Sequence, residues 1–166
     1  MIQDLEHQKL ILQTFSQALQ LDTNPSIRAK AAETLGKLRI EAAIQSLLNA
    51  LGDPDKAVRY HSAQALGELG DVAAIPRLSQ LLLDEDAVVR ACTATALGHI
   101  GSDKAIAHLS QSLTDGDPQV RAQAARALGQ IGAQAAIPVL LQRLGDPDDE
   151  VRFQAVEAIG LIGAQE

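Results

Sequence analysis

The sequence is short of aromatic residues: its 166 residues include one tyrosine, two phenylalanines and no tryptophan. A hydrophobic core must therefore be built from Ala, Leu, Ile and Val, which supply most of the hydrophobic residues that make up 46% of the chain. Ala and Leu are strong helix formers, so this composition favours closely packed helices.

Other absences narrow the class of protein. Cys92 is the only cysteine, so no disulfide can form within the chain and nothing indicates an oxidising compartment. The first residues do not read as a signal peptide, and no apolar stretch approaches the ~20 residues that span a bilayer. A net charge of −7 argues against nucleic-acid binding and favours partners with basic patches. We therefore expect a cytoplasmic protein that binds neither membrane nor nucleic acid.

The chain does have a strict internal repeat of 31 residues. An arginine recurs at this interval as Arg28, Arg59, Arg90, Arg121 and Arg152. A glycine recurs eight residues after each arginine as Gly36, Gly67, Gly98, Gly129 and Gly160. An aspartate recurs six residues before each arginine as Asp22, Asp53, Asp84, Asp115 and Asp146. Three residue types in one register, without an insertion, predict five tandem structural units.

Each unit is expected to fold as two helices, helix A and helix B. Helix A shows helical spacing of apolar residues, as in 75–82, and has Pro76 or Pro138 near its start in two units. Helix B starts at an N-cap four residues before the arginine, where the sequence has Asn24, Asp55, Asp86, Asp117 and Asp148. Its stop is a glycine suited to a left-handed conformation at Gly70, Gly101, Gly132 and Gly163. Arg39 stands in that position in the first unit, so its turn should be less regular.

We expect a single domain over residues 1–166, with residues 1–21 as an N-terminal capping helix that serves as the first helix A. Helix B is expected near 25–38, 56–69, 87–100, 118–131 and 149–162. The glycines inside helix B each cost about 1 kcal/mol relative to alanine, which predicts close backbone approach between stacked helices. The last helix shows no cap, which predicts an exposed end, an end-to-end self-association contact or a longer array.

The motif Asp53-Pro54-Asp55-Lys56-Ala57-Val58-Arg59, with the Ala-Leu-Gly and Ala-Ile-Pro segments, resembles HEAT-like repeats of the phycobilin-lyase type over residues 22–163. The resemblance implies an all-α, right-handed α-solenoid of five repeats with helix B on the concave side. It also implies that the repeated Asp and Arg form a ladder linking successive repeats. Related families include bilin lyase subunits, phycobilisome-degradation factors, deoxyhypusine hydroxylase and adaptors, and the fold alone does not choose among them.

We find no arrangement of residues suited to catalysis or metal binding. No histidine is followed by glutamate, which excludes the di-iron site of deoxyhypusine hydroxylase. The acidic turns, such as 53–55, lack the spacing of a calcium-binding loop and are explained by the ladder and the N-caps. Cys92 and His99 are seven residues apart, about 10 Å along a helix, too far for a nucleophile and its base. We expect no catalytic residue, no metal and no cofactor.

Four positions of helix B vary between units: those one, two, five and nine residues after the arginine. Spacings of three and four residues put these positions on one helix face. We predict that the concave face binds protein through Tyr60, His61, Gln64, Glu68, Cys92, Thr95, His99, Gln123, Arg126, Gln130, Phe153, Gln154 and Glu157. The aromatic residues Tyr60 and Phe153 are candidate anchors; the alternative is that they fill gaps between helices.

These observations favour a non-catalytic protein-binding scaffold. The alternative, which rests on the resemblance, is a subunit of a bilin lyase or another phycobilisome-related chromophore-handling factor. Its partner would be a phycobiliprotein or a partner subunit of the lyase, and Lys30, Lys37 and Arg126 are the cations available for the propionates of a tetrapyrrole. A consensus-designed origin is a third interpretation, against which the uneven surface and Cys92 argue.

Overall fold

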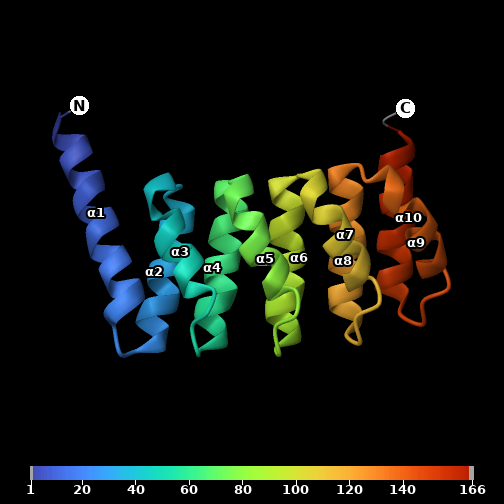
Figure 1. The fold of residues 1–166 in the computed structure, drawn as a ribbon, viewed down its shortest axis with the longest axis horizontal. Coiled ribbons are helices and arrows are strands. Elements are labelled where there is room, and N and C mark those ends of the chain that lie inside the picture. Colours follow the sequence, from blue (N-terminus) through green and yellow to red (C-terminus); the bar gives the residue numbers. More distant parts are fainter. Residues whose placement is uncertain (1, 165–166) are drawn as a thin grey trace.

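The computed structural model describes residues 2–164, and every regular element within them is helical (Figure 1). The first helix pair is α1 (Ile2–Leu21) and α2 (Pro25–Lys37). The later A helices are α3 (Ile44–Ala50), α5 (Ile75–Leu81), α7 (Ile106–Ser112) and α9 (Ile137–Arg143). The later B helices are α4 (Lys56–Leu69), α6 (Ala87–Ile100), α8 (Pro118–Ile131) and α10 (Asp149–Gly163). The predicted all-α solenoid of helix pairs is confirmed.

Each later A helix is entered through a turn of 3₁₀ helix. These turns are Glu41–Ala43, Val72–Ala74, Asp103–Ala105 and Gln134–Ala136. Pro76 and Pro138 lie in the first turn of α5 and α9. Proline lacks a backbone N–H, but in the first turn this group would have no acceptor within the helix, so no helical hydrogen bond is lost. No helix within residues 2–164 is both long and apolar enough to cross a bilayer.

The B helices begin and end mostly as their sequences predict. The side chain of Asp55 accepts a hydrogen bond from the Ala57 amide at 2.9 Å, and the other predicted N-caps do the same for α2, α6, α8 and α10. Gly70, Gly101 and Gly132 end α4, α6 and α8 with φ between 70° and 76°. The expected left-handed stop at Gly163 is wrong, because α10 continues through this residue to a cap at Ala164 with φ −80°.

Arg39 takes the left-handed position at the end of the first repeat, with φ 51°. It is the only non-glycine residue with positive φ in the described part of the chain. Such a conformation is strained for an L-residue with a side chain, so the first turn departs from the pattern of the others. Helix α2 correspondingly stops at Lys37, one residue before the expected end.

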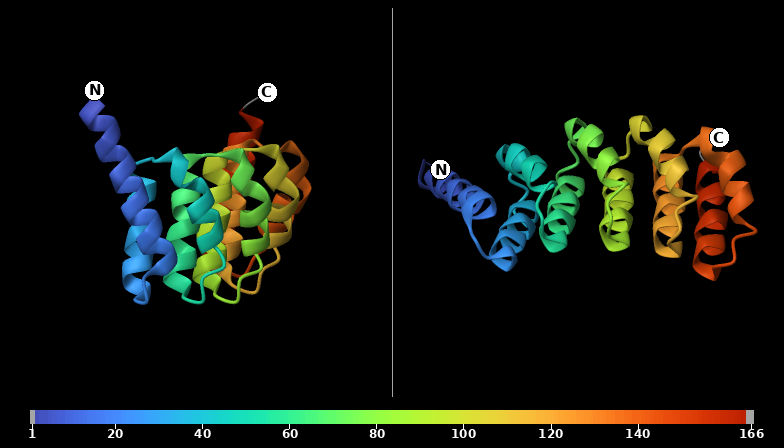
Figure 2. Two further views of the ribbon diagram at one scale, coloured as in Figure 1. Left: turned by 60° about the vertical axis from the view of Figure 1, so that its left-hand side comes forward. Right: turned by 60° about the horizontal axis from the view of Figure 1, so that its bottom comes forward.

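Successive B helices pack closely along one row. A Cβ atom at Gly67 would lie 2.7 Å from Ala96 Cα, and one at Gly129 would lie 2.7 Å from Ala158 Cα. These glycines therefore allow a backbone approach that a side chain would prevent. The A helices fan apart more widely than the B helices (Figure 2). The row of B helices is the inner side of a gently curved solenoid.

Candidate functional site on the inner face of the B helices

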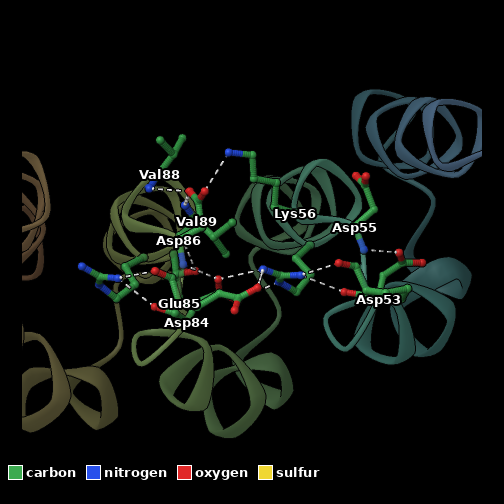
Figure 3. A network of polar contacts seen from close by, with 12 residues as sticks. Asp53, Asp55, Lys56, Asp84, Glu85, Asp86, Val88 and Val89 are labelled. Atoms are coloured by element: carbon green, nitrogen blue, oxygen red, sulfur yellow. Dashed lines mark hydrogen bonds and ion pairs between the residues drawn. The ribbon is translucent and has the colours of Figure 1, made fainter.

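A ladder of ion pairs holds the repeats in register. Arg59 donates from Nε to Asp84 Oδ2 at 2.7 Å and from Nη2 to Asp84 Oδ1 at 2.9 Å, in the region shown in Figure 3. The same pairing joins Arg28 with Asp53, Arg90 with Asp115 and Arg121 with Asp146. In addition, Arg59 Nη1 donates to the Asp53 carbonyl of its own repeat at 3.0 Å. The ladder implied by the family resemblance is confirmed at these four junctions.

The ladder carboxylates are also part of the acidic turns. Asp53 Oδ1 accepts a hydrogen bond from the Asp55 amide at 2.9 Å, so one carboxylate both shapes the turn and links two repeats. Hydrogen bonds from Arg121 lower the pKa of Asp146 and outweigh the opposing effect of burial. Burial acts to raise the pKa of Asp53, but the hydrogen bonds from Arg28 reverse it and the net pKa is lowered. In residues 2–164 no group of three or more His, Cys, Asp or Glu is placed to hold a metal ion.

On this frame the inner face is hollowed between α4 and α6. The hollow has a volume of about 170 Å³ and is lined by Ala96 and by six of the predicted residues: Tyr60, Gln64, Glu68, Cys92, Thr95 and His99. Gln64 Nε2 donates to Glu68 Oε1 at 3.0 Å, which holds these two side chains together along α4. Small-molecule sites usually measure roughly 300–1,000 Å³, so this hollow suits one inserted side chain rather than a whole ligand.

Cys92 is a structural thiol in this wall. Its Sγ donates to the Tyr60 carbonyl of the preceding repeat at 3.6 Å. Burial, and secondarily the nearby Glu68 carboxylate, raise the pKa of Cys92 to about 12. The thiol therefore stays protonated at neutral pH and is a poor nucleophile.

The residues predicted for the inner face fall into an exposed group and a half-buried group. His99, Arg126, Gln130 and Glu157 are exposed, whereas the half-buried ones are Tyr60, His61, Gln64, Glu68, Cys92, Thr95 and Gln123. Gln123 Oε1 accepts from Thr95 Oγ1 at 3.2 Å, which ties α8 to α6. The positions five and nine residues after the arginine therefore supply most of the accessible polar groups of the inner face.

Two predicted residues do not belong to this surface. Gln154 is only 9% exposed and donates to Glu150 Oε1 at 2.9 Å, so it is not available to a partner. Phe153 is 57% exposed, but its equivalents Ala29, Ala91 and Ala122 are buried where the next B helix covers them. Phe153 therefore lies on the outward flank of α10, at the end of the array, and not beside Tyr60.

Two further hollows adjoin this one, and some of the residues that line them are not among those predicted from the sequence. Toward the ends of α2 and α4 the surface opens into a wider hollow of about 640 Å³, lined by Gly36, Lys37, Arg39, Gly67, Glu68, Gly70 and His99. Toward the starts of α4 and α6 an apolar hollow of about 240 Å³ is lined by Lys56, Ala57, Tyr60, His61, Asp86, Val88 and Val89. Arg39 lines the wider hollow, although its place in the repeat predicts only an irregular turn.

Comparison with known proteins agrees with this architecture. A family model for HEAT repeats matches residues 12–92, 44–117 and 106–166. No match is found among curated proteins. Among solved structures, a chain from the complex of CpcE and CpcF of phycocyanin lyase from Nostoc sp. PCC7120 is 31% identical, with a TM-score of 0.82. The match covers 93% of this chain and 65% of that one, so this chain spans about two thirds of the relative's length.

Other similar structures are designed proteins. An engineered protein is 25% identical over 92% of this chain and 81% of its own, with a TM-score of 0.68. A designed armadillo repeat protein in complex with the peptide (KR)4 is 18% identical, with a TM-score of 0.72, and covers 89% of this chain and 80% of its own. The second likeness shows the fold alone. Because the stretches matched by the family model together run from residue 12 to residue 166, the chain belongs to the HEAT-repeat family.

Proposed function

We propose that the chain is a non-catalytic, cytoplasmic scaffold that binds another protein along the inner face of its B helices. The hollow between α4 and α6 carries this proposal, because it offers a half-buried aromatic ring and several polar groups around a space the size of one side chain. Beyond it, the exposed Arg126, Gln130 and Glu157 continue the same face over α8 and α10. A partner held by several repeats at once is the usual way in which solenoids bind.

The charge of this face indicates what kind of partner fits. Across the five repeats the inner row carries the cations Lys30, Lys37 and Arg126 and the carboxylates Glu33, Glu68 and Glu157. The face is therefore balanced, although the whole chain has a net charge of −7. Most of the aspartates are instead used in the ladder and the N-caps. The net charge alone favours a partner with basic patches, but the balanced inner face fits a polar partner of low net charge, and we propose the latter.

A matched pair of triple variants tests this proposal. H99A/R126A/Q130A removes three exposed side chains from the inner face, and R77A/H108A/Q111A removes the same three types from the outer A helices. Both proteins are used as bait in a lysate of the source cells, and co-purified proteins are quantified by mass spectrometry. The inner-face variant should lose its specific partner by about tenfold or more, as expected for interface hot spots, and the outer-face variant should retain it.

Circular dichroism melts of both variants provide the control for folding. Equal loss of the partner in the two variants, or retention in both, would reject the inner face as the binding surface.

A second candidate function is that of a bilin lyase subunit or another chromophore-handling factor. It is favoured by the 31% identity to a chain of the CpcE–CpcF complex and by the wider hollow, where Lys37, Arg39 and His99 lie together. The cations Lys37 and Arg39 match the two propionates that a tetrapyrrole carries. The hollow between α4 and α6 is too small to enclose such a pigment, so the pigment would lie across the ends of α2 and α4.

Absorption spectroscopy separates the two candidates. Phycocyanobilin is mixed with the protein, with a K37Q/R39Q variant and with a K9Q/R77Q variant that changes the same charges elsewhere. If the second candidate holds, the wild type and K9Q/R77Q shift and sharpen the pigment spectrum, and K37Q/R39Q does not. A spectrum equal to that of free pigment in all three samples contradicts pigment binding. Gel filtration with CpcF from Nostoc then tests whether this chain assembles as its relative does.

A further inference from the structure

The wider hollow at the ends of α2 and α4 contains an arginine in a strained conformation. Arg39 has a φ of 51°, whereas Gly70, Gly101 and Gly132 hold the equivalent place in the next three repeats. A side chain makes this conformation unfavourable, and a glycine would adopt it freely. Residues held in such conformations are found preferentially at functional sites, which points to a role for the Arg39 side chain.

Arg39 is exposed, and its side chain has no hydrogen bond or ion pair in the described part of the chain. It lines the hollow of about 640 Å³ together with Lys37 and His99. Lys37 is already engaged, because Lys30 and Lys37 both donate to Glu33. These hydrogen bonds lower the pKa of Glu33 to about 2. Arg39 is therefore the cation of this hollow that is free to receive an anion.

Hydrogen-bond acceptors stand beside Arg39 in the same hollow. Glu68 reaches over the end of α2, since its Oε2 lies 3.2 Å from the place that a Cβ atom at Gly36 would take. The last carbonyl groups of α2 and α4 also lie at this end of the repeats and have no donor within their helix. A ligand that fits this arrangement has one negative charge and N–H donors close to it.

An acidic residue of a polypeptide has these properties. A guanidinium binds a carboxylate through two parallel hydrogen bonds, and the amide N–H groups next to an acidic side chain can donate to Glu68 and to the helix-end carbonyls. A phosphate or a pigment with two propionates brings a second negative charge. That charge is repelled by Glu68 and by the helix ends, unless it displaces Glu33 from Lys37. The volume lies within the roughly 300–1,000 Å³ of ligand sites, so a whole residue can enter.

We propose that this hollow binds an acidic side chain of the protein partner, and that Arg39 holds its carboxylate. The assignment of the carboxylate to a partner rests on the proposed scaffold function, whereas the carboxylate site itself does not. Arg39 then provides binding at a cost in stability, because a glycine in its place would give a relaxed turn without the site. In the next three repeats glycine takes this place, so no second guanidinium stands at an equivalent position.

Nuclear magnetic resonance titration of the isotope-labelled chain tests the site. The probe is N-acetylglutamate N-methylamide, which combines one carboxylate with amide N–H groups, and its glutamine counterpart is the neutral control. The acidic probe should shift the Arg39 Nε–H and the amides of Gly67 and Gly70 with a Kd on the order of 1–10 mM, and the neutral probe should not. R39Q should weaken binding by about tenfold or more, and R77Q, the same change on exposed α5, should not.

Thermal melts separate binding from strain. R39G should raise the melting temperature by about 1–4 °C, because glycine adopts a positive φ without strain. R39Q keeps a side chain at this place and should not raise it. Both variants should lose the acidic probe, so the loss of binding does not follow from a change in stability. A lower melting temperature for R39G would assign Arg39 a structural role and overturn the inference.

Co-purification tests the source of the carboxylate, and the titration reports on the site whether or not a partner is recovered. R39Q as bait should lose the specific partner by about tenfold or more, and R77Q should retain it. Retention by R39Q together with loss by H99A/R126A/Q130A would overturn this inference and leave the scaffold proposal standing. So would the absence of any shift at about 50 mM acidic probe, or a shift of the Arg39 Nε–H at lower concentrations of inorganic phosphate or phycocyanobilin than of that probe.

Discussion

At the scale of single residues, the side chain of each interior ladder arginine contacts both its own repeat and the next one. One end of Arg59 pairs with a carboxylate of the next repeat, and the other end donates to carbonyls of the turn before its own helix. The sequence period identified every ladder arginine, and the family resemblance supplied its ionic partner. The carbonyl contacts were not predicted, because they depend on the backbone path of the turn and not on residue types.

Replacing Arg59 by methionine should destabilise the fold by about 3 kcal/mol, because it leaves the nearly buried Asp84 carboxylate without its partner. Arg152→Met is the matched control, since Arg152 has no carboxylate from another repeat. It should cost less than about 1 kcal/mol, as for an exposed ion pair. Urea unfolding followed by circular dichroism measures both. Equal destabilisation by the two changes would show that the bridge between repeats contributes little.

The ladder also predicts how stability depends on pH. The folded pKa of Asp146 lies below its ordinary value of about 4, so the pair stabilises the fold above that pH. This contribution is lost as the pH falls from about 4 through the lower folded pKa. D146N removes one titrating group, so its free energy of unfolding should fall less steeply than that of the wild type below pH ~4. Urea titrations at a series of pH values provide the measurement, and parallel curves would contradict the prediction.

At the scale of elements, helix B was predictable in position and the details of helix A were not. N-cap residues and glycines mark the ends of helix B directly in the sequence. The 3₁₀ entry into helix A depends on turns between pairs, where Asp71 or Ser102 caps the turn in some repeats and no side chain does in others. A glycine permits a left-handed turn but does not require one, and at Gly163 the helix α10 continues through the residue.

The glycines at which successive B helices approach closely give a prediction for two equivalent positions, Gly67 and Gly160. Gly67→Ala should destabilise the protein by about 1–3 kcal/mol, because the added methyl group meets the Ala96 backbone. Gly160→Ala should leave stability unchanged or raise it by up to about 1 kcal/mol, since the methyl group meets nothing and alanine favours the helix. Thermal unfolding at low protein concentration compares them. A destabilised Gly160→Ala variant would mean that this glycine is needed for another reason.

The candidate site, like the helices, was predictable from the sequence only in part. Positions five and nine residues after the arginine reach the inner surface in most repeats, as helical spacing predicts. The position one residue after it lies at the junction with the next B helix, and the position two residues after it lies at the junction with the preceding one, as the contact of Cys92 with the Tyr60 carbonyl shows. Exposure at both positions therefore depends on neighbours that periodicity within one helix does not reveal. This is why Tyr60 is half-buried, Gln154 is buried and Phe153 is exposed at the end of the array.

At the scale of the whole molecule, each helix pair contacts mainly the pairs before and after it, so stability is distributed along the array. Hydrogen exchange should therefore show the strongest amide protection in α4, α6 and α8, and weaker protection in α1 and α10, which have one neighbouring pair each. Mass spectrometry of the exchanging protein at low concentration resolves this gradient. Uniform protection along the chain would indicate a single cooperative unit instead.

The scarcity of aromatic residues has a practical consequence for Tyr60. In a chain without tryptophan, Tyr60 is the only tyrosine, and its ring belongs to the wall of the hollow between α4 and α6. Intrinsic tyrosine fluorescence from this protein therefore originates from one known place on its inner face. Anything that fills the hollow would alter that signal directly, without a dye and without an added label.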